Sequence, residues 1–168
     1  MPVLFSALLP PDDVVEAVAE ALGHHEEDGL RWEPPERWHV TLAYYVQDDV
    51  ETRAAWLEDR LAGRPAVDVR LEKAATFPGV LWLTVAGPEL TPLAHAAGAD
   101  AEDRPYVPHL TLARFPREHP GLAKRWTKAL AGFTSRGWTG AEAVLMTSER
   151  EPGGHRYRVA RSFELNRA

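Results

Sequence analysis

The chain contains no cysteine among its 168 residues, which excludes a disulfide framework and a thiolate-bound metal. It has no apolar run near the roughly 20 residues that an α-helix needs to cross a membrane. Residues 1–11 lack a basic segment and hold only a short apolar stretch, so they are typical of a β-strand rather than a signal peptide. We therefore expect a cytoplasmic protein whose stability comes from packing.

Positive charge is also scarce: 19 Lys and Arg residues stand against 25 Asp and Glu residues, a net charge of -6. A protein that coats duplex nucleic acid needs many cations for the phosphates, so this balance argues against that class. A single terminal phosphate needs only a local positive site. The length suits one domain and no low-complexity linker divides the chain, so we expect a single domain over residues 1–168, and a monomer.

Strands and helices follow one another without the regular crossovers of a parallel sheet. Residue content and apolar spacing predict strands at 2–9, 30–32, 38–45, 66–76, 80–86, 107–114, 138–147 and 155–165, and helices at 13–22, 49–62, 89–97 and 118–131. This order indicates an α+β fold. The two halves have a similar order, which predicts two pseudo-symmetric lobes around a central cleft, with antiparallel sheets flanked by helices.

One tetrapeptide pattern occurs twice, as His39-Val40-Thr41-Leu42 and as His109-Leu110-Thr111-Leu112, both on predicted strands. Alternate residues of a strand project from the same face, so each histidine shares a face with its threonine. If the two strands meet, two imidazoles and two hydroxyls converge on a space that suits a phosphate. An isolated His-x-Thr would more often be a half-buried strand residue, but the repeat favours a functional site.

Two histidines can catalyse in-line cleavage of a phosphodiester without a metal, one as base on the attacking oxygen and one as acid on the leaving oxygen. Thr41 and Thr111 would donate hydrogen bonds to the non-bridging oxygens. Arg114 is the nearest fixed cation in sequence, at an odd offset from His109 where a loop or strand end would turn it inward. A zinc site is rejected, because threonine stands where a second ligand would be needed.

Other residues are weaker candidates. The remaining histidines fall in predicted helix ends or turns, where a surface role is favoured: His24, His25, His95, His119 and His155. His155, beside Arg156, could instead border the cleft. Phe5, Tyr44 and Trp82 are candidates for stacking on a base next to the phosphate. The alternative for each aromatic residue is a place in the core.

With both motifs in place, the chain resembles the two-histidine phosphoesterase superfamily, most closely the RNA 2′,3′-cyclic phosphodiesterases historically called 2′-5′ RNA ligases. The resemblance runs nearly end to end. Besides the motifs, it rests on residues 3–10, Arg31-Trp32 ahead of Trp38-His39, 77–82, 106–114 and 157–165.

The resemblance implies a bilobal fold, no metal or other cofactor, and hydrolysis of a cyclic phosphate on an RNA 3′ end or small nucleotide to a 2′-phosphomonoester. Arg114 matches the family's phosphate-contacting arginine. One histidine would activate water and the other would protonate the departing 3′-oxygen, and we expect His109 as the base and His39 as the acid. Gly79 stands where many relatives place an arginine, and the 77–80 loop is shorter, which makes short substrates more plausible.

Two alternatives remain open at this point. The first is ligation that forms a 2′-5′ bond, the reverse of the same chemistry with a 5′-hydroxyl in place of water. The second is a non-catalytic module that recognises RNA ends or terminal phosphates with the same side chains. A pure binder has no need for two groups that titrate near neutral pH, so a bell-shaped pH profile of turnover would exclude it.

Overall fold

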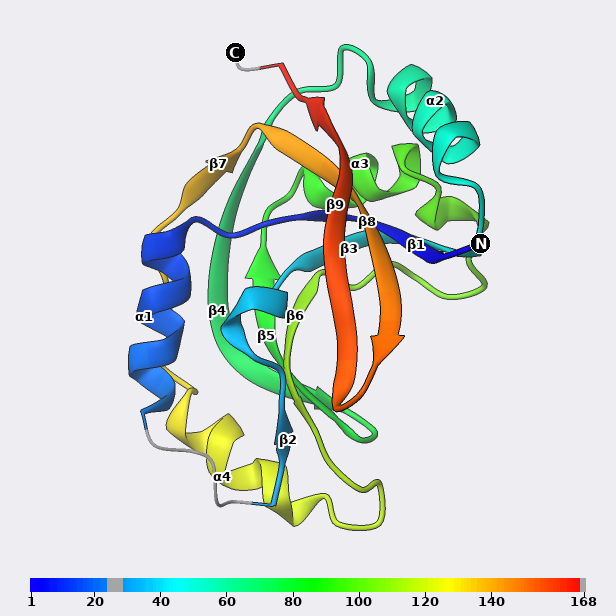
Figure 1. The fold of residues 1–168 in the computed structure, drawn as a ribbon. Coiled ribbons are helices and arrows are strands. Elements are labelled where there is room, and N and C mark those ends of the chain that lie inside the picture. The colour runs from blue at the N-terminus through cyan, green and yellow to red at the C-terminus, as the bar shows by residue number, and fades with distance from the viewer. Residues whose placement is uncertain (24–28, 167–168) are drawn as a thin grey trace.

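Strands dominate the computed structural model, which describes residues 1–23 and 29–166. The strands in these residues are β1 (Val3–Leu8), β2 (Arg31–Trp32), β3 (Val40–Gln47), β4 (Val67–Phe77), β5 (Val80–Ala86), β6 (His109–Arg114), β7 (Trp138–Gly140), β8 (Glu142–Glu151) and β9 (Gly154–Glu164). The α-helices are α1 (Asp12–Leu22), α2 (Val50–Leu61), α3 (Leu90–Ala96) and α4 (Gly121–Ala129). Figure 1 shows them around a curled sheet.

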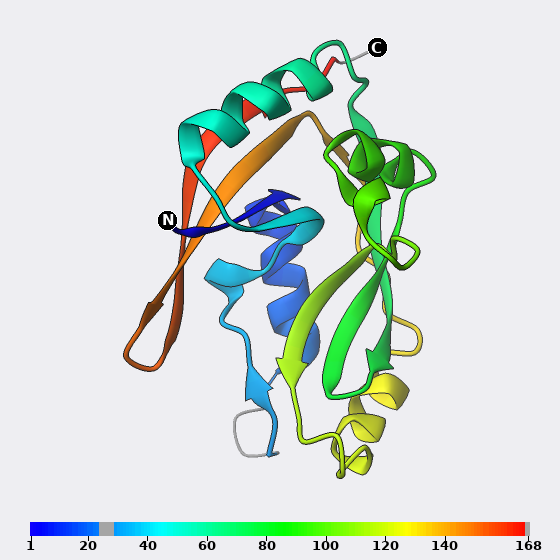
Figure 2. The same cartoon turned by 90° about the vertical axis from the view of Figure 1, so that its right-hand side faces the viewer.

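The strands form one antiparallel sheet with the order β7-β4-β5-β6-β3-β1-β8-β9, and β2 pairs with β6 beside this path. Its two halves meet between β6 and β3, where a single residue pair, Val40 with Leu110, joins the strands. Figure 2 shows that β3 and β6 diverge away from this point. The sheets expected for two lobes are therefore joined at one bridge, which lies inside both His-x-Thr motifs.

Along the chain, the N-terminal and C-terminal halves repeat one order of elements. The first runs β1-α1-β3-α2-β4 and the second runs β5-α3-β6-α4-β8, each with one short extra strand. The final strand of each repeat pairs with the first strand of the other, since β4 pairs with β5 and β8 pairs with β1, while β9 lies outside the repeat and pairs with β8. This exchange of strands gives the α+β fold its pseudo-twofold character.

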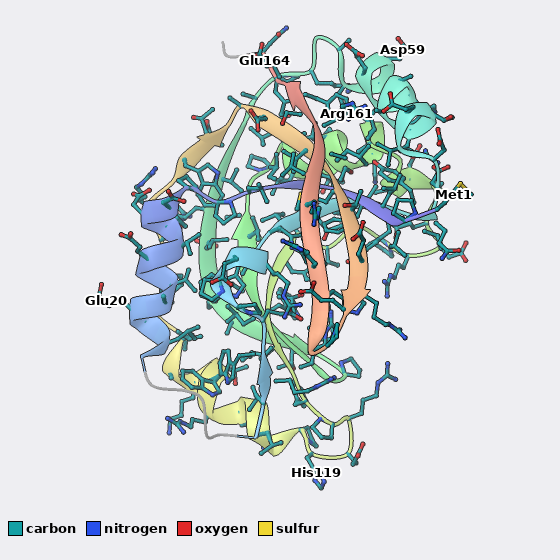
Figure 3. All side chains as sticks on the ribbon, in the orientation of Figure 1. Met1, Glu20, Asp59, His119, Arg161 and Glu164 are labelled. Carbon is teal, nitrogen blue, oxygen red and sulfur yellow. The ribbon has the colours of Figure 1, made fainter. Side chains whose placement is uncertain are left out.

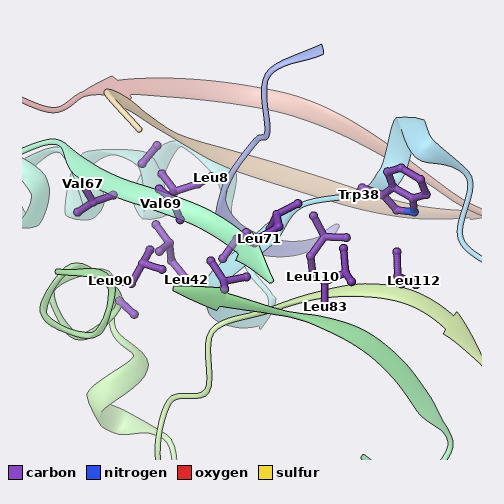
Figure 4. Packing of buried hydrophobic residues seen from close by; sticks show 14 of the residues in the cluster. Leu8, Trp38, Leu42, Val67, Val69, Leu71, Leu83, Leu90, Leu110 and Leu112 are labelled. Atoms are coloured by element: carbon purple, nitrogen blue, oxygen red, sulfur yellow. The ribbon is translucent and has the colours of Figure 1, made fainter. Parts of the chain in front are cut away.

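The two faces of the sheet carry different cores. The larger cluster includes Leu42, Leu71, Leu83, Leu110 and Leu112, all 0 to 1 % exposed, and packs beneath the helices (Figure 4). A smaller cluster of Phe5, Ala7, Val144 and Met146 lies on the other face, which we call the open face. This separation follows from the alternation of side chains along β1 and β8.

The sequence predicted most boundaries to within three residues. An exception is residues 138–147, expected as one strand, where the chain passes from β7 to β8 at Ala141 and the two strands take different partners. Among the described residues, no helix is long and apolar enough to cross a membrane. His95 and His119 are exposed, and Figure 3 shows His119 at the lower end of the molecule. His24 and His25 lie outside the described residues.

Candidate active site

Four polar side chains surround the bridge between the two halves of the sheet. Val40 and Leu110 are 0 % exposed and face the larger core. His39 and Thr41 flank Val40, while His109 and Thr111 flank Leu110, and all four have intermediate exposure on the open face. Because the pairing is antiparallel, a local twofold axis through the bridge relates the two His-x-Thr pairs. The structure thus brings together the residues that the repeat predicted.

Both imidazoles are held by the same backbone contact. Nδ1 of His39 lies 2.7 Å from the carbonyl oxygen of Arg37, and Nδ1 of His109 lies 2.8 Å from that of Val107. A carbonyl oxygen only accepts, so each Nδ1 carries the proton and donates it. The neutral tautomer therefore leaves Nε2 without a proton in both rings, ready to accept one.

Aromatic rings pack against each imidazole. The ring centroid of His39 lies 4.9 Å from that of Phe5 and 5.6 Å from that of Tyr157. The ring centroid of His109 lies 5.2 Å from that of Phe77 and 5.7 Å from that of Trp82. These contacts fix the plane of each imidazole and remove much of its hydration.

Burial lowers the pKa of both histidines below the ordinary 6.5. In both, the backbone hydrogen bond at Nδ1 opposes this effect. For His39, the charge of Glu33 also raises the pKa, whereas His109 lowers it. For His109, the charges of Arg104 and Arg114 lower the pKa further. The two imidazoles are therefore alike in geometry but differ in the charges around them.

A bulge in each motif strand re-aims the side chains that come after the threonine. Thr41 pairs with Ala7 and Ala43 with Ser6, so Leu42 is an extra residue, and Tyr44 then returns to the open face opposite Phe5. In the second motif, Thr111 pairs with Trp82 and Ala113 with Leu81, so Leu112 is extra and Arg114 returns to the open face. Since a bulge changes which face the later residues occupy, it explains the inward turn of Arg114 despite its odd offset.

Tyr44 and Arg114 thus occupy equivalent positions in the two halves. The repeat extends to His-x-Thr-Leu-Ala in both motifs, and only the next residue differs in kind. Tyr44 is 53 % exposed, and the side chain of Arg114 is 49 % exposed. One side of the site therefore presents an aromatic ring, and the other a guanidinium.

Glu33 is a residue of the site that the sequence did not reveal. One carboxylate oxygen lies 3.2 Å from Nε of Arg37 and the other lies 3.8 Å from Nε of Arg114. The backbone of Glu33 is fixed as well, because its N–H donates to the carbonyl oxygen of Leu112 and its own carbonyl oxygen accepts from the indole N–H of Trp38. The spacing of four residues to Arg37 was the available signal, but it did not indicate Arg114.

Two aromatic candidates are buried. Phe5 is 1 % exposed, and its ring contacts His39, Tyr44 and Tyr157. Trp82 is 7 % exposed and packs against Phe77 and His109. Both therefore support the rings next to them, and Tyr44 is the candidate whose face reaches solvent. Residues 1–23 and 29–166 contain no group of three or more His, Cys, Asp or Glu side chains that could hold a metal ion.

Known proteins resemble this chain in sequence and in fold. The sequence model of the 2′-5′ RNA ligase superfamily matches residues 10–152, most of the chain and both motifs. The chain belongs to this superfamily. No sequence among the curated proteins matches it significantly. Membership in the 2′-5′ RNA ligase superfamily supports a phosphoesterase activity.

Solved structures share the fold over nearly the whole length. TT0787 of Thermus thermophilus is 24% identical with a TM-score of 0.75 and covers 97% of each chain. A protein described as a phosphoesterase is 22% identical with a TM-score of 0.77 and covers 98% of each chain. E. coli LigT complexed with 3′-AMP is 22% identical with a TM-score of 0.76, covering 98% of this chain and 99% of LigT.

Proposed function

We propose that this superfamily member is a cyclic phosphodiesterase that hydrolyses a 2′,3′-cyclic phosphate at an RNA 3′ end, or on a nucleotide, to a 2′-phosphomonoester. The observation that carries the proposal is the pair of imidazoles related by a local twofold axis, each with Nδ1 donating to a carbonyl and Nε2 left free. Two such groups provide a base and an acid on opposite sides of a phosphorus atom. The proposed chemistry uses no metal.

The charges around the histidines favour one assignment of roles. His109 lies near Arg104 and Arg114, which oppose its protonation, so it acts as the base. His39 lies near Glu33, which favours its protonation, so it acts as the acid. Nε2 of His109 takes a proton from water as the water oxygen bonds to phosphorus. The bond from phosphorus to the 3′-oxygen breaks, and His39 gives that oxygen its proton.

The other polar groups bind the phosphate. Among the described residues, no protein group forms a hydrogen bond with the hydroxyl of Thr41 or Thr111, so both can donate to non-bridging oxygens. Arg114 supplies positive charge where negative charge grows in the transition state. In this proposal the phosphate lies between the two motifs.

Tyr44 offers the matching contact for a base. Its exposed ring lies on the His39 side of the site, and the ring of Phe5 supports it from below, with centroids 5.5 Å apart. Stacking of a base on an aromatic ring contributes about 1 to 3 kcal/mol. Phe5 contributes to substrate binding through Tyr44 and His39. The complexes of E. coli LigT with 3′-AMP and with phosphate support a nucleotide as ligand of this fold.

The test is incubation of the purified protein with an RNA oligonucleotide ending in a 2′,3′-cyclic phosphate, in excess EDTA. Conversion to the 2′-phosphate is expected. His39→Ala and His109→Ala should each lower turnover by about 10² to 10⁴-fold, the usual contribution of an acid or base. His95→Ala, an exposed histidine of α3, is the matched control. Equal activity of the parent and both site variants would contradict the proposal.

Ligation would use the same four side chains in the reverse direction, with a 5′-hydroxyl taking the place of water. To test for ligation, an oligonucleotide with a free 5′-hydroxyl is added to the same reaction and the yield of joined product is measured. Binding without turnover, under every condition in which the protein is folded, would instead identify a module for RNA ends.

A further inference from the structure

The hairpin of β8 and β9 continues the open face beyond the active site. Cross-strand pairs assign its side chains to faces, because paired residues project to the same side. Ser148 pairs with Tyr157, and the next open-face pair toward the turn is Arg150 with His155. The intervening pair, Glu149 with Arg156, projects to the opposite face, as does Glu151 near the turn. Figure 2 shows the end of the hairpin extending away from the other strands.

Charge is distributed unequally between these two faces of the hairpin. Both acidic residues of its outer part, Glu149 and Glu151, lie on the far face together with Arg156 and Arg158, so that face is balanced. Arg161, further along β9, binds Glu51 of α2. The open face carries Arg150 and His155 and no acidic residue in this part. Arg150 therefore stands on the open face with no carboxylate beside it on the hairpin, in a protein of net charge -6.

The strip of Tyr157, His155 and Arg150 on this face is continuous with the site. The ring of Tyr157 contacts both His39 and Phe5, and the hydroxyl of Ser148 lies 3.4 Å from Nδ1 of His155. Two residues along a strand span about 7 Å, so Arg150 and His155 lie one such step beyond Tyr157. A line of open-face side chains thus runs from the imidazole of His39 through the ring of Tyr157 to Arg150 and His155.

Arg37 fixes the position of this strip relative to His39. Its Nη1 donates to the carbonyl oxygen of His155 at 2.7 Å, and its guanidinium lies 5.9 Å from the ring centroid of Tyr157. The backbone carbonyl of the same arginine holds Nδ1 of His39. One residue therefore connects the catalytic imidazole to the hairpin that extends the open face.

We propose that this strip, formed by Tyr157, His155 and Arg150, binds the single-stranded RNA that precedes the terminal cyclic phosphate. Single-strand binding combines aromatic rings for bases with cations for the backbone, and both are present in line with the site. The exposed side chain of Val159, 49 % exposed on the same face, adds apolar surface for a base or ribose. The inference rests on the proposed function and adds that an RNA strand is preferred to a mononucleotide.

The test compares two substrates with the same reacting group: a nucleoside 2′,3′-cyclic phosphate and a five-nucleotide RNA that ends in it. The measured quantity is the ratio of kcat/KM for the oligonucleotide to kcat/KM for the nucleotide. Arg150→Ala should lower this ratio about fivefold, the upper range for an exposed ion pair. Arg156→Ala, the neighbouring arginine on the far face, is the matched control and should leave the ratio unchanged.

Binding gives a second readout that does not need turnover. We would measure the anisotropy of a labelled RNA ending in a 2′-phosphate, the expected product, at several salt concentrations. Loss of one phosphate contact should reduce the slope of log Kd against log salt concentration by about 0.7 for Arg150→Ala. The slope for Arg156→Ala should match the parent.

Each outcome bears on one of the two proposals. A ratio near one for the parent, or equal effects of the two arginine variants, would overturn the strip as an RNA-binding surface even if the nucleotide is hydrolysed. Turnover of neither substrate, with binding that depends on Arg150 and not on Arg156, would support the strip and contradict the proposed hydrolysis.

Discussion

A carboxylate oxygen of Glu33 lies 3.8 Å from Nε of Arg114, so an acidic side chain on the segment before the first motif faces the cation that comes after the second. The side chain of Glu33 is 20% exposed and also contacts Arg37. Glu33 therefore connects Arg37, whose backbone carbonyl binds Nδ1 of His39, with Arg114, which we assign to the phosphate.

The charge of Glu33 should influence the titration of His39. Glu33→Gln removes a charge that raises the pKa of this histidine, so the imidazolium form is lost at lower pH. The alkaline limb of the kcat/KM profile should move to lower pH, and kcat/KM at pH 7.5 should fall up to about fivefold, as for partly screened charges. NMR titration of His39 measures the same shift. Glu36→Gln, at an exposed neighbouring glutamate, is the control; an alkaline limb that does not move would contradict this role of Glu33.

The whole pH profile should lie on the acidic side of an ordinary two-histidine enzyme. Burial lowers the pKa of both His39 and His109, and kcat/KM is highest where the base is neutral while the acid is still protonated. We expect a bell with its maximum below pH 6.5 and a decline through neutrality. Bound phosphate favours the protonated forms, so the kcat profile should be displaced to higher pH. A kcat/KM maximum at pH 7.5 or above would contradict the assignment.

The equivalent residues Tyr44 and Arg114 should differ in the kinetic constant that they control. Loss of stacking in Tyr44→Ala should raise KM about tenfold with little change in kcat, whereas Tyr44→Phe should behave like the parent. Arg114→Ala should lower kcat about 10² to 10³-fold, because its charge acts in the transition state. Steady-state kinetics at saturating substrate separates the two, and parallel changes in kcat and KM for both variants would refute the division of roles.

Strain at Val46 should be removable. Val46 has φ of +57°, a left-handed conformation that costs a non-glycine residue about 1 to 2 kcal/mol, and it is 71% exposed. Val46→Gly should raise the free energy of unfolding by about 0.5 to 1 kcal/mol after the greater chain entropy of glycine is subtracted. Val159→Gly, at an exposed valine with ordinary φ, should lower it. Urea denaturation compares both, and destabilisation by both would show that Val46 is not strained.

The juxtaposition of His39 and His109 could be predicted from the sequence because it depends on local rules. Alternation along a strand places a histidine and the threonine two residues later on one face, and repetition of the motif indicates that both strands serve one site. The α+β fold could be predicted similarly from apolar spacing. The helix predicted at 49–62 spans residues 50–61, since its apolar spacing and the glycine after it are local signals.

Other features depend on contacts between distant segments. The bulges at Leu42 and Leu112 contain no glycine or proline from which they could be predicted. They follow only from the pairing of β3 and β6 with their neighbours. The ring of Tyr157 reaches His39 from the last strand, more than 100 residues later in the chain. The interaction of Glu33 with Arg114 depends on the pairing of β2 with β6, and β2 has only two residues to signal it.

The bridge between Val40 and Leu110 gives the proposed catalytic centre a local twofold symmetry, because the same histidine, threonine and carbonyl contact lie in the same order on either side of it. Such a centre does not by itself distinguish the two orientations of a cyclic phosphate, because rotation of the substrate about the twofold axis brings it to the same groups. The direction of reaction must then be imposed by residues outside the repeat, namely Tyr44, Glu33, whose charge acts on His39, and Arg104 and Arg114, whose charges act on His109. Exchanging those surroundings, with both motifs intact, would exchange the acid and the base.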